Sequence, residues 1–87
     1  MPIDFDQVLH ALAHPERRQF VLACRDNPRA AGELAEQSSL SVATVSEHLK
    51  ILRLSGLLVL DRQGRHWFYR TDPAVLSATL KHLRQLL

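Results

Sequence analysis

The chain has 87 residues, of which 46% are hydrophobic and 23% are charged, and its formal net charge is +2. This composition is too apolar for a disordered chain, and the length fits a single domain over residues 1–87. No apolar run approaches the roughly 20 residues that span a bilayer, no signal-peptide pattern opens the chain, and the single cysteine excludes an intrachain disulfide, so we expect a cytoplasmic protein without membrane association.

The first part of the chain predicts three short helices. Residues 4–13 open with Asp4 and Gln7, a spacing that resembles a capping box, and carry apolar side chains at helical spacing. A second helix is expected over residues 15–25, because its first residue is a proline, which suits the first turn of a helix. A third helix is expected over residues 31–37, followed by a short turn.

The clearest helical pattern lies in residues 41–55. Ser41 occupies the N-cap position, and Gly56 supplies the residue with positive φ that commonly follows the end of a helix. One apolar stripe is expected to face the core and consists of Val42, Val45, Leu49 and Leu52. The opposite side is then left facing outward.

A β-hairpin is expected after this helix. Residues 58–61 and 66–70 predict two strands, and Gly64 permits the positive φ of the turn between them. Because side chains alternate across a strand, we expect Trp67 and Tyr69 on one face and Phe68 on the other.

The last predicted helix begins at Pro73, with either Thr71 or Asp72 as its cap. Its apolar residues follow the spacing i, i+4, i+7 and i+11. Together with apolar residues of the first helix they form more apolar surface than a small core easily hides, which favours a homodimer over the alternative that they are internal core. The expected interface residues are Phe5, Leu9, Leu12, Leu76, Leu80, Leu83 and Leu87.

The order of four helices, two strands and a last helix predicts a mainly α fold with a small β-hairpin, the winged helix-turn-helix class. Positive charge is concentrated in the predicted helix 41–55, which we call the reading helix, and in the hairpin. Residues 41–70 carry five Lys or Arg against two Asp or Glu, whereas residues 1–40 carry four against six. This distribution favours contact with nucleic acid, although a solvated basic face is the simpler alternative.

In helix-turn-helix proteins the second helix of the motif enters the major groove, and its N-terminal residues contact bases. We therefore expect base contacts from Ser41, Ala43, Thr44, Ser46 and Glu47 in helix 41–55. Contacts with phosphates or the minor groove are expected from Lys50 and from three residues of the wing at 61–67, namely Arg62, Arg65 and His66.

Three runs of sequence resemble the ArsR/SmtB family of bacterial winged-helix repressors: LAHPERRQFVL (residues 12–22), AGELAEQSSLSVATVSEHLKILRLSGLL (31–58) and RQGRHWFYR (62–70). The resemblance implies a homodimer formed by the first and last helices. It also implies binding to a palindromic operator in double-stranded DNA, with the TVSEHLK helix in the major groove and the hairpin beside the backbone or minor groove.

Many members of that family sense metals or thiols, but this sequence lacks their usual ligands. The third helix contains Gly32-Glu33-Leu34-Ala35-Glu36 where arsenic-type members carry a Cys pair. In the zinc-type pattern Asp72 is followed by Ala74 instead of His, and Gln85 occupies the later ligand position. We expect no metal or cofactor, and the sequence does not identify an inducer.

The remaining Cys and His residues have simpler interpretations. Cys24 is expected to fill the core, and His48 to pack beneath the reading helix. His10 and His14 have the i, i+4 spacing of zinc ligands, but two ligands do not complete a site. His66 and His82 are expected at the solvated surface.

No nucleophile with a base, Gly-rich phosphate loop or pair of acids indicates an enzyme. A winged-helix module that binds protein and not DNA is the alternative function. The two differ in salt dependence, because binding to a duplex weakens steeply as salt rises.

Overall fold

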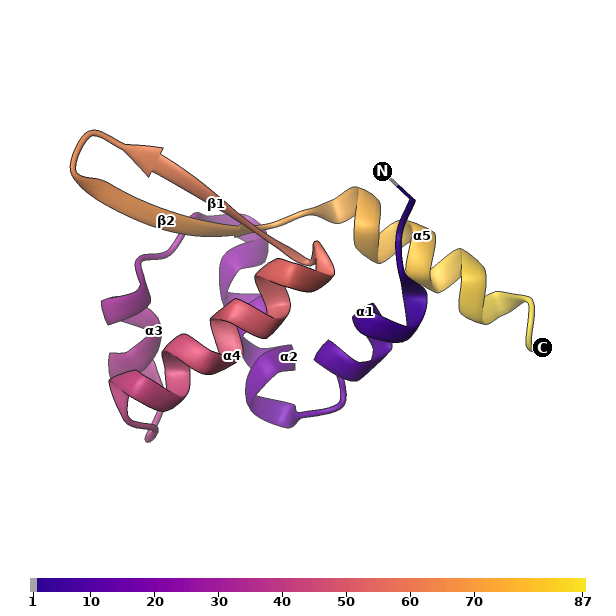
Figure 1. Cartoon of the computed structure of the whole chain (residues 1–87), viewed down its shortest axis with the longest axis horizontal. Coiled ribbons are helices and arrows are strands. Elements are labelled where there is room, and N and C mark those ends of the chain that lie inside the picture. The colour runs from indigo at the N-terminus through magenta and orange to yellow at the C-terminus, as the bar shows by residue number, and fades with distance from the viewer. Residues whose placement is uncertain (1) are drawn as a thin grey trace.

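The computed structural model describes residues 2–87, which form five helices and one two-stranded sheet (Figure 1). In chain order the elements are α1 (Phe5–Ala11), α2 (Pro15–Asp26), α3 (Ala31–Gln37), α4 (Val42–Ser55), β1 (Leu58–Gln63), β2 (His66–Thr71) and α5 (Pro73–Arg84). This order confirms the predicted winged helix-turn-helix class. Within residues 2–87, none of the helices combines the length and apolarity needed to cross a bilayer.

Local sequence signals set most helix ends. The side chain of Asp4 accepts a hydrogen bond from the Gln7 N–H and caps α1, which is shorter than the predicted 4–13. Of the two candidate caps of α5, Thr71 and Asp72, the structure has Asp72, whose carboxylate accepts a hydrogen bond from the Ala74 N–H. Gly56 ends α4 with φ of 90°, a conformation that a side chain at this position would strain.

The hairpin pairs β1 with β2 antiparallel from Leu58 opposite Thr71 to Gln63 opposite His66. Gly64 has φ of 63° in the turn, as predicted. Both strands are longer than expected, since the pairing continues up to the turn. The hairpin therefore projects as an arm beyond the helices (Figure 1).

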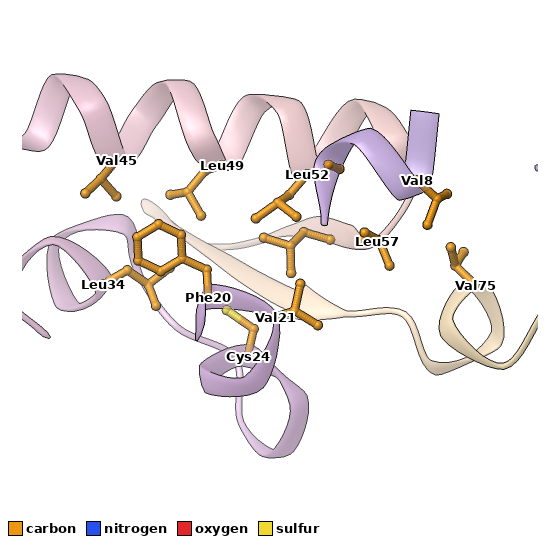
Figure 2. Close-up of a cluster of buried hydrophobic side chains, with 12 residues drawn as sticks. Val8, Phe20, Val21, Cys24, Leu34, Val45, Leu49, Leu52, Leu57 and Val75 are labelled. Atoms are coloured by element: carbon orange, nitrogen blue, oxygen red, sulfur yellow. The ribbon is translucent and has the colours of Figure 1, made fainter. Parts of the chain in front are cut away.

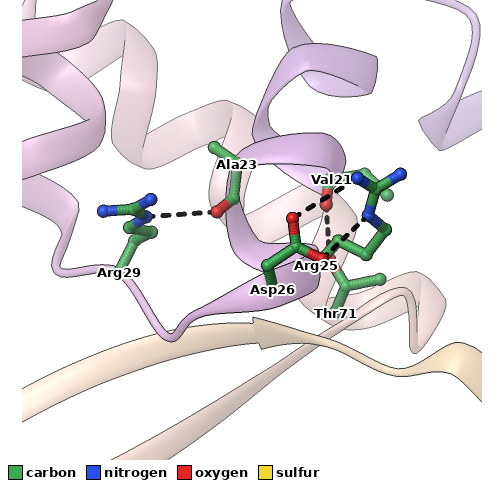
Figure 3. A network of polar contacts seen from close by, with 6 residues as sticks. All are labelled: Val21, Ala23, Arg25, Asp26, Arg29 and Thr71. Carbon is green, nitrogen blue, oxygen red and sulfur yellow. Dashed lines mark hydrogen bonds and ion pairs between the residues drawn. The ribbon is translucent and has the colours of Figure 1, made fainter.

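The base of the hairpin is fastened to the loop between α2 and α3. Arg29 and Tyr69 exchange backbone hydrogen bonds of 2.9 and 2.8 Å. The Thr71 hydroxyl donates to the Val21 carbonyl at 2.7 Å, and Arg29 Nε donates to the Ala23 carbonyl at 3.1 Å (Figure 3). These bonds satisfy buried polar groups and fix the direction in which the arm leaves the domain.

One hydrophobic core connects all five helices and the start of the sheet (Figure 2). Its members are Val8, Ala11, Phe20, Val21, Cys24, Leu34, Val45, Leu49, Leu52, Leu57, Leu58 and Val75. The core confirms Cys24 as a buried filler. The prediction that Val42 belongs to the core is wrong, because this residue is 66% exposed in the first turn of α4, at the edge of the domain.

Candidate nucleic-acid interface

Helix α4 divides cleanly into a buried and an exposed side. Val45, Leu49 and Leu52 are at most 1% exposed and lie against the other helices (Figure 2). All the predicted contact residues of the helix are exposed, and we call them the outer row: Ser41, Ala43, Thr44, Ser46, Glu47 and Lys50. The packing that buries one side thus leaves the outer row in solvent, with its shorter side chains toward the N-terminus of the helix.

The first turn of α4 is held by a local pair of hydroxyl groups. Ser41 Oγ accepts from the Thr44 N–H at 3.2 Å and donates to Thr44 Oγ1 at 2.9 Å. The Ser41 hydroxyl therefore serves the helix cap, a structural role in addition to the predicted base contact. Thr44 Oγ1 accepts the bond from Ser41 Oγ, and within residues 2–87 its hydroxyl donates to no other group.

The tip of the hairpin carries three exposed basic side chains, Arg62, Arg65 and His66. Arg62 Nε donates to the Gly64 carbonyl at 3.0 Å, and its guanidinium lies 5.3 Å from the centre of the Trp67 ring. Arg65 makes no hydrogen bond or ion pair within residues 2–87. Arg62 is thus oriented by its neighbours, whereas Arg65 projects into solvent.

The faces of β2 also agree with the predicted alternation. Trp67 shares its side of the strand with Tyr69, which packs partly on the core, while Phe68 lies on the other side. Trp67 itself is half-exposed near the tip. Lower on the arm, Arg70 Nε and Asp61 Oδ2 pair at 2.9 Å and link the two strands.

The His48 side chain lies on the side of α4 that faces α2, as predicted, and is held by a residue that the sequence analysis missed. Arg17 is buried on α2, and its Nε donates to His48 Nδ1 at 3.0 Å. Burial lowers the pKa of His48, and the positive charge of Arg17 lowers this pKa further. Helical spacing could have revealed the burial of Arg17. This residue precedes the core residues Phe20, Val21 and Cys24 by three, four and seven positions, which places it on the same side of α2.

The other Cys and His residues are distributed between the core and the surface. Within residues 2–87 no three His, Cys, Asp or Glu side chains come together in a way that would hold a metal ion. Burial raises the pKa of the Cys24 thiol to about 11, so this group is a neutral thiol at pH 7. His66 and His82 are at the surface, as predicted, although the His82 ring also stacks on Phe5 with 4.1 Å between centroids.

The predicted interface residues fall into two groups. Half-buried residues in or beside α1 and at the start of α5 are Phe5, Leu9, Leu12 and Leu76. Farther along α5, Leu80 is 59% exposed and Leu83 is 37% exposed. Leu87 is fully exposed but lies beyond α5, so the prediction that it extends the helical stripe is wrong. Backbone bonds from residue i to i−3 tighten the chain after Arg84 and end the regular helix.

Taken together, the helix-turn-helix formed by α3 and α4 and the hairpin beside it define a winged helix-turn-helix protein. A family model described as a helix-turn-helix domain matches residues 12–61. The transcriptional regulator Rv2034 of Mycobacterium tuberculosis is 37% identical over 73 residues, a match covering 84% of this chain and 68% of that protein. The chain belongs to the ArsR/SmtB family of winged-helix transcriptional regulators.

Two further comparisons agree with this assignment. The transcriptional repressor SmtB of Mycobacterium tuberculosis is 39% identical over 64 residues, which cover 74% of this chain but 47% of that protein. The chain therefore spans about half the length of this relative. An ArsR-like transcriptional regulator from Rhodococcus sp. RHA1 superposes with a TM-score of 0.86 at 26% identity, covering 94% of this chain and 77% of that structure.

Proposed function

We propose that this chain is a sequence-specific DNA-binding transcriptional repressor that acts as a homodimer on a palindromic operator. One observation carries the proposal: the outer row of α4 is exposed over its whole length, while the opposite side of the same helix is buried in the core. Membership of a family of transcriptional regulators supports it, as does the similarity to SmtB, a transcriptional repressor.

The outer row fits the edges of bases in the major groove. Ala43, Thr44 and Ser46 are short, so the helix backbone can approach the groove floor closely. Glu47 can accept from the amino group of cytosine, and Lys50 lies one turn farther along, where a phosphate is the natural partner of an ammonium group. Ser41 is also proposed to contact a base, because it is exposed at the N-terminus of α4.

The hairpin tip supplies contacts beside the groove. Arg62, Arg65 and His66 are exposed at the end of an arm whose base is fixed to the domain. We assign them to phosphates or to a narrow minor groove, where positive side chains are favoured. Of these residues, Arg65 has the greatest freedom to move toward the duplex.

Exposed leucines on α5 support a second copy of the chain as partner. Leu80 and Leu83 continue the apolar stripe of α5 that begins at the half-buried Leu76. Covering these side chains against their symmetry mates removes apolar surface from water, and a twofold axis presents the same residues from both copies. Such a dimer has two α4 helices to place about 34–36 Å apart, in successive major grooves.

The test is selection of bound sequences from a pool of random duplexes. We expect enrichment of a palindrome whose half-sites are separated by about one helical turn, and affinity that falls steeply between low and moderate salt. Lys50→Ala should weaken this binding, whereas the matched control Lys81→Ala, which removes an exposed lysine of α5, should not. No enrichment together with salt-insensitive binding to a protein partner would favour the protein-interaction module instead.

A further inference from the structure

The contact between Arg17 and His48 joins three helices through one buried charge. Arg17 is 5% exposed, and within residues 2–87 no carboxylate pairs with it. Arg17 itself is on α2. Its Nε donates to His48 Nδ1 of α4 at 3.0 Å, and its Nη1 donates to the His10 carbonyl of α1 at 3.3 Å. A buried guanidinium is costly unless its donors are satisfied, so both neutral acceptors matter to the fold.

This geometry requires His48 to be neutral. An imidazole nitrogen that accepts a hydrogen bond carries a free lone pair, so the proton of neutral His48 resides on Nε2. Protonation of Nδ1 replaces the acceptor with a donor that faces the donor of Arg17. The hydrogen bond is then lost, and two positive charges are left in contact beneath α4.

The charged and titratable groups around His48 come from the start of α2 and its N-cap. The His14 ring lies with its centroid 6.0 Å from that of His48, and its positive form disfavours a second charge there, whereas Glu16 favours one. α1 contributes the His10 carbonyl through Arg17. Burial has the largest effect and Arg17 the next, so the net result is a His48 pKa below its ordinary value.

We propose that the Arg17–His48 hydrogen bond positions α4 on α1 and α2 only while His48 is neutral, so that protonation of His48 loosens the reading helix and weakens duplex binding in acid. The DNA part of this inference rests on the proposed function. Arg17 and His48 are positioning residues, since both act from behind the outer row and neither belongs to it.

The direction of the pH effect distinguishes loosening of α4 from the general gain of positive charge in acid. Acidification adds positive charge to a protein, and added positive charge strengthens binding to phosphates. Release of α4 has the opposite effect. Because the folded state holds the His48 proton less readily than the unfolded chain does, stability is also lost as pH falls from about 6.5 through the lower folded pKa.

The test compares the wild type with His48→Asn and His48→Leu. Asparagine offers an acceptor near the position of Nδ1 at every pH, whereas leucine removes the acceptor and leaves Arg17 Nε unsatisfied. Duplex affinity is measured from pH 7.5 to pH 5, with circular dichroism confirming that each variant stays folded. Relative to His48→Asn, the wild type should lose about tenfold in affinity across this range, as expected for loss of one buried hydrogen bond to a charged group.

A second measurement on the same proteins needs no DNA. Nitrogen-15 NMR of the wild-type histidines should show the Nε2–H tautomer of His48 at pH 7.5, and its titration should shift α4 amides that stay fixed in His48→Asn. An Nδ1–H tautomer, or α4 amides indifferent to the titration, would overturn the inference. Identical affinity profiles for wild type and His48→Asn would do the same, whereas failure of the wild type to bind any duplex at pH 7.5 would overturn the proposed function.

Discussion

Helices α4 and α5 have similar apolar periodicity but are used differently by the fold. In α4 the stripe Val45, Leu49 and Leu52 is fully buried, and the exposed outer row is mostly polar, although Val42 and Leu54 are exposed as well. In α5 only the first part of the stripe is covered, and Leu80 and Leu83 remain in solvent. The periodicity of a helix therefore indicates that one side seeks apolar contact, but the contact can lie within the chain or with another copy.

The difference assigns a separate task to each exposed surface. Apart from Ala43, the outer row of α4 consists of side chains that can form hydrogen bonds with bases and phosphates, so water and DNA are suitable partners. The exposed side of α5 consists of leucines, which gain most from an apolar partner. In the proposed function α4 reads the duplex, and α5 places a second copy of α4 beside the first.

The largest expected effect comes from breaking the α5 surface. Leu80→Glu combined with Leu83→Glu places charges on the proposed interface, so sedimentation should show a monomer. Operator affinity should fall by more than about 100-fold, because two linked reading helices bind far more tightly than one. Leu22→Glu is the matched control, since Leu22 is 50% exposed on α2, away from the stripe. A double variant that stays dimeric would remove α5 from the interface.

Truncation within the α4 stripe should instead cost stability. Leu49→Ala removes a side chain that is 0% exposed, and we expect the free energy of unfolding to fall by about 3–5 kcal/mol. Leu54→Ala on the same helix, at a residue that is 55% exposed, should change it by no more than about 0.5 kcal/mol. Urea unfolding of both variants measures the contrast, and equal losses would show that α4 is not anchored by this stripe.

Removing a phosphate contact should have a smaller effect that is the same for every sequence. Lys50→Ala and Arg65→Ala should each weaken binding to operator and random duplex alike, and each should reduce the slope of log affinity against log salt by about 1 per subunit. Fluorescence anisotropy at several salt concentrations measures this slope. A loss confined to the operator would instead place these side chains on bases.

The smallest effect on overall affinity is expected from Ser46, a short uncharged side chain of the outer row. Ser46→Ala removes one exposed hydroxyl, and it should change the preference at one base pair in each half-site by about 1–3 kcal/mol while leaving the salt slope intact. Repeating the duplex selection with this variant reveals the altered position. An unchanged selected sequence would exclude Ser46 from base contact.

Much of the fold was predictable because its boundaries depend on local chemistry. Ser41 caps α4, Gly56 ends it and Gly64 forms the hairpin turn, each through the conformation or hydrogen bond that its residue type favours. The outer row was found for the same reason, since helical periodicity separates the buried side from the exposed side. These signals need no knowledge of the tertiary contacts.

The features that sequence reasoning missed depend on neighbours distant in the chain. Val42 has the right spacing for the core, but the domain ends before covering it. Arg17 was overlooked because an arginine on the buried side of a helix is unusual, and its acceptor His48 lies 31 residues away. The end of α5 at Arg84 likewise cannot be read from the continuing leucine spacing.

The measurement closest to the central proposal is an NMR titration of nitrogen-15-labelled protein with a duplex at low salt. We expect the largest amide shifts in the first turns of α4 and at the hairpin tip, with α5 unaffected. Absence of any shift, or shifts concentrated on α2 and α5 with the start of α4 silent, would contradict the assignment of α4 as the DNA-reading helix.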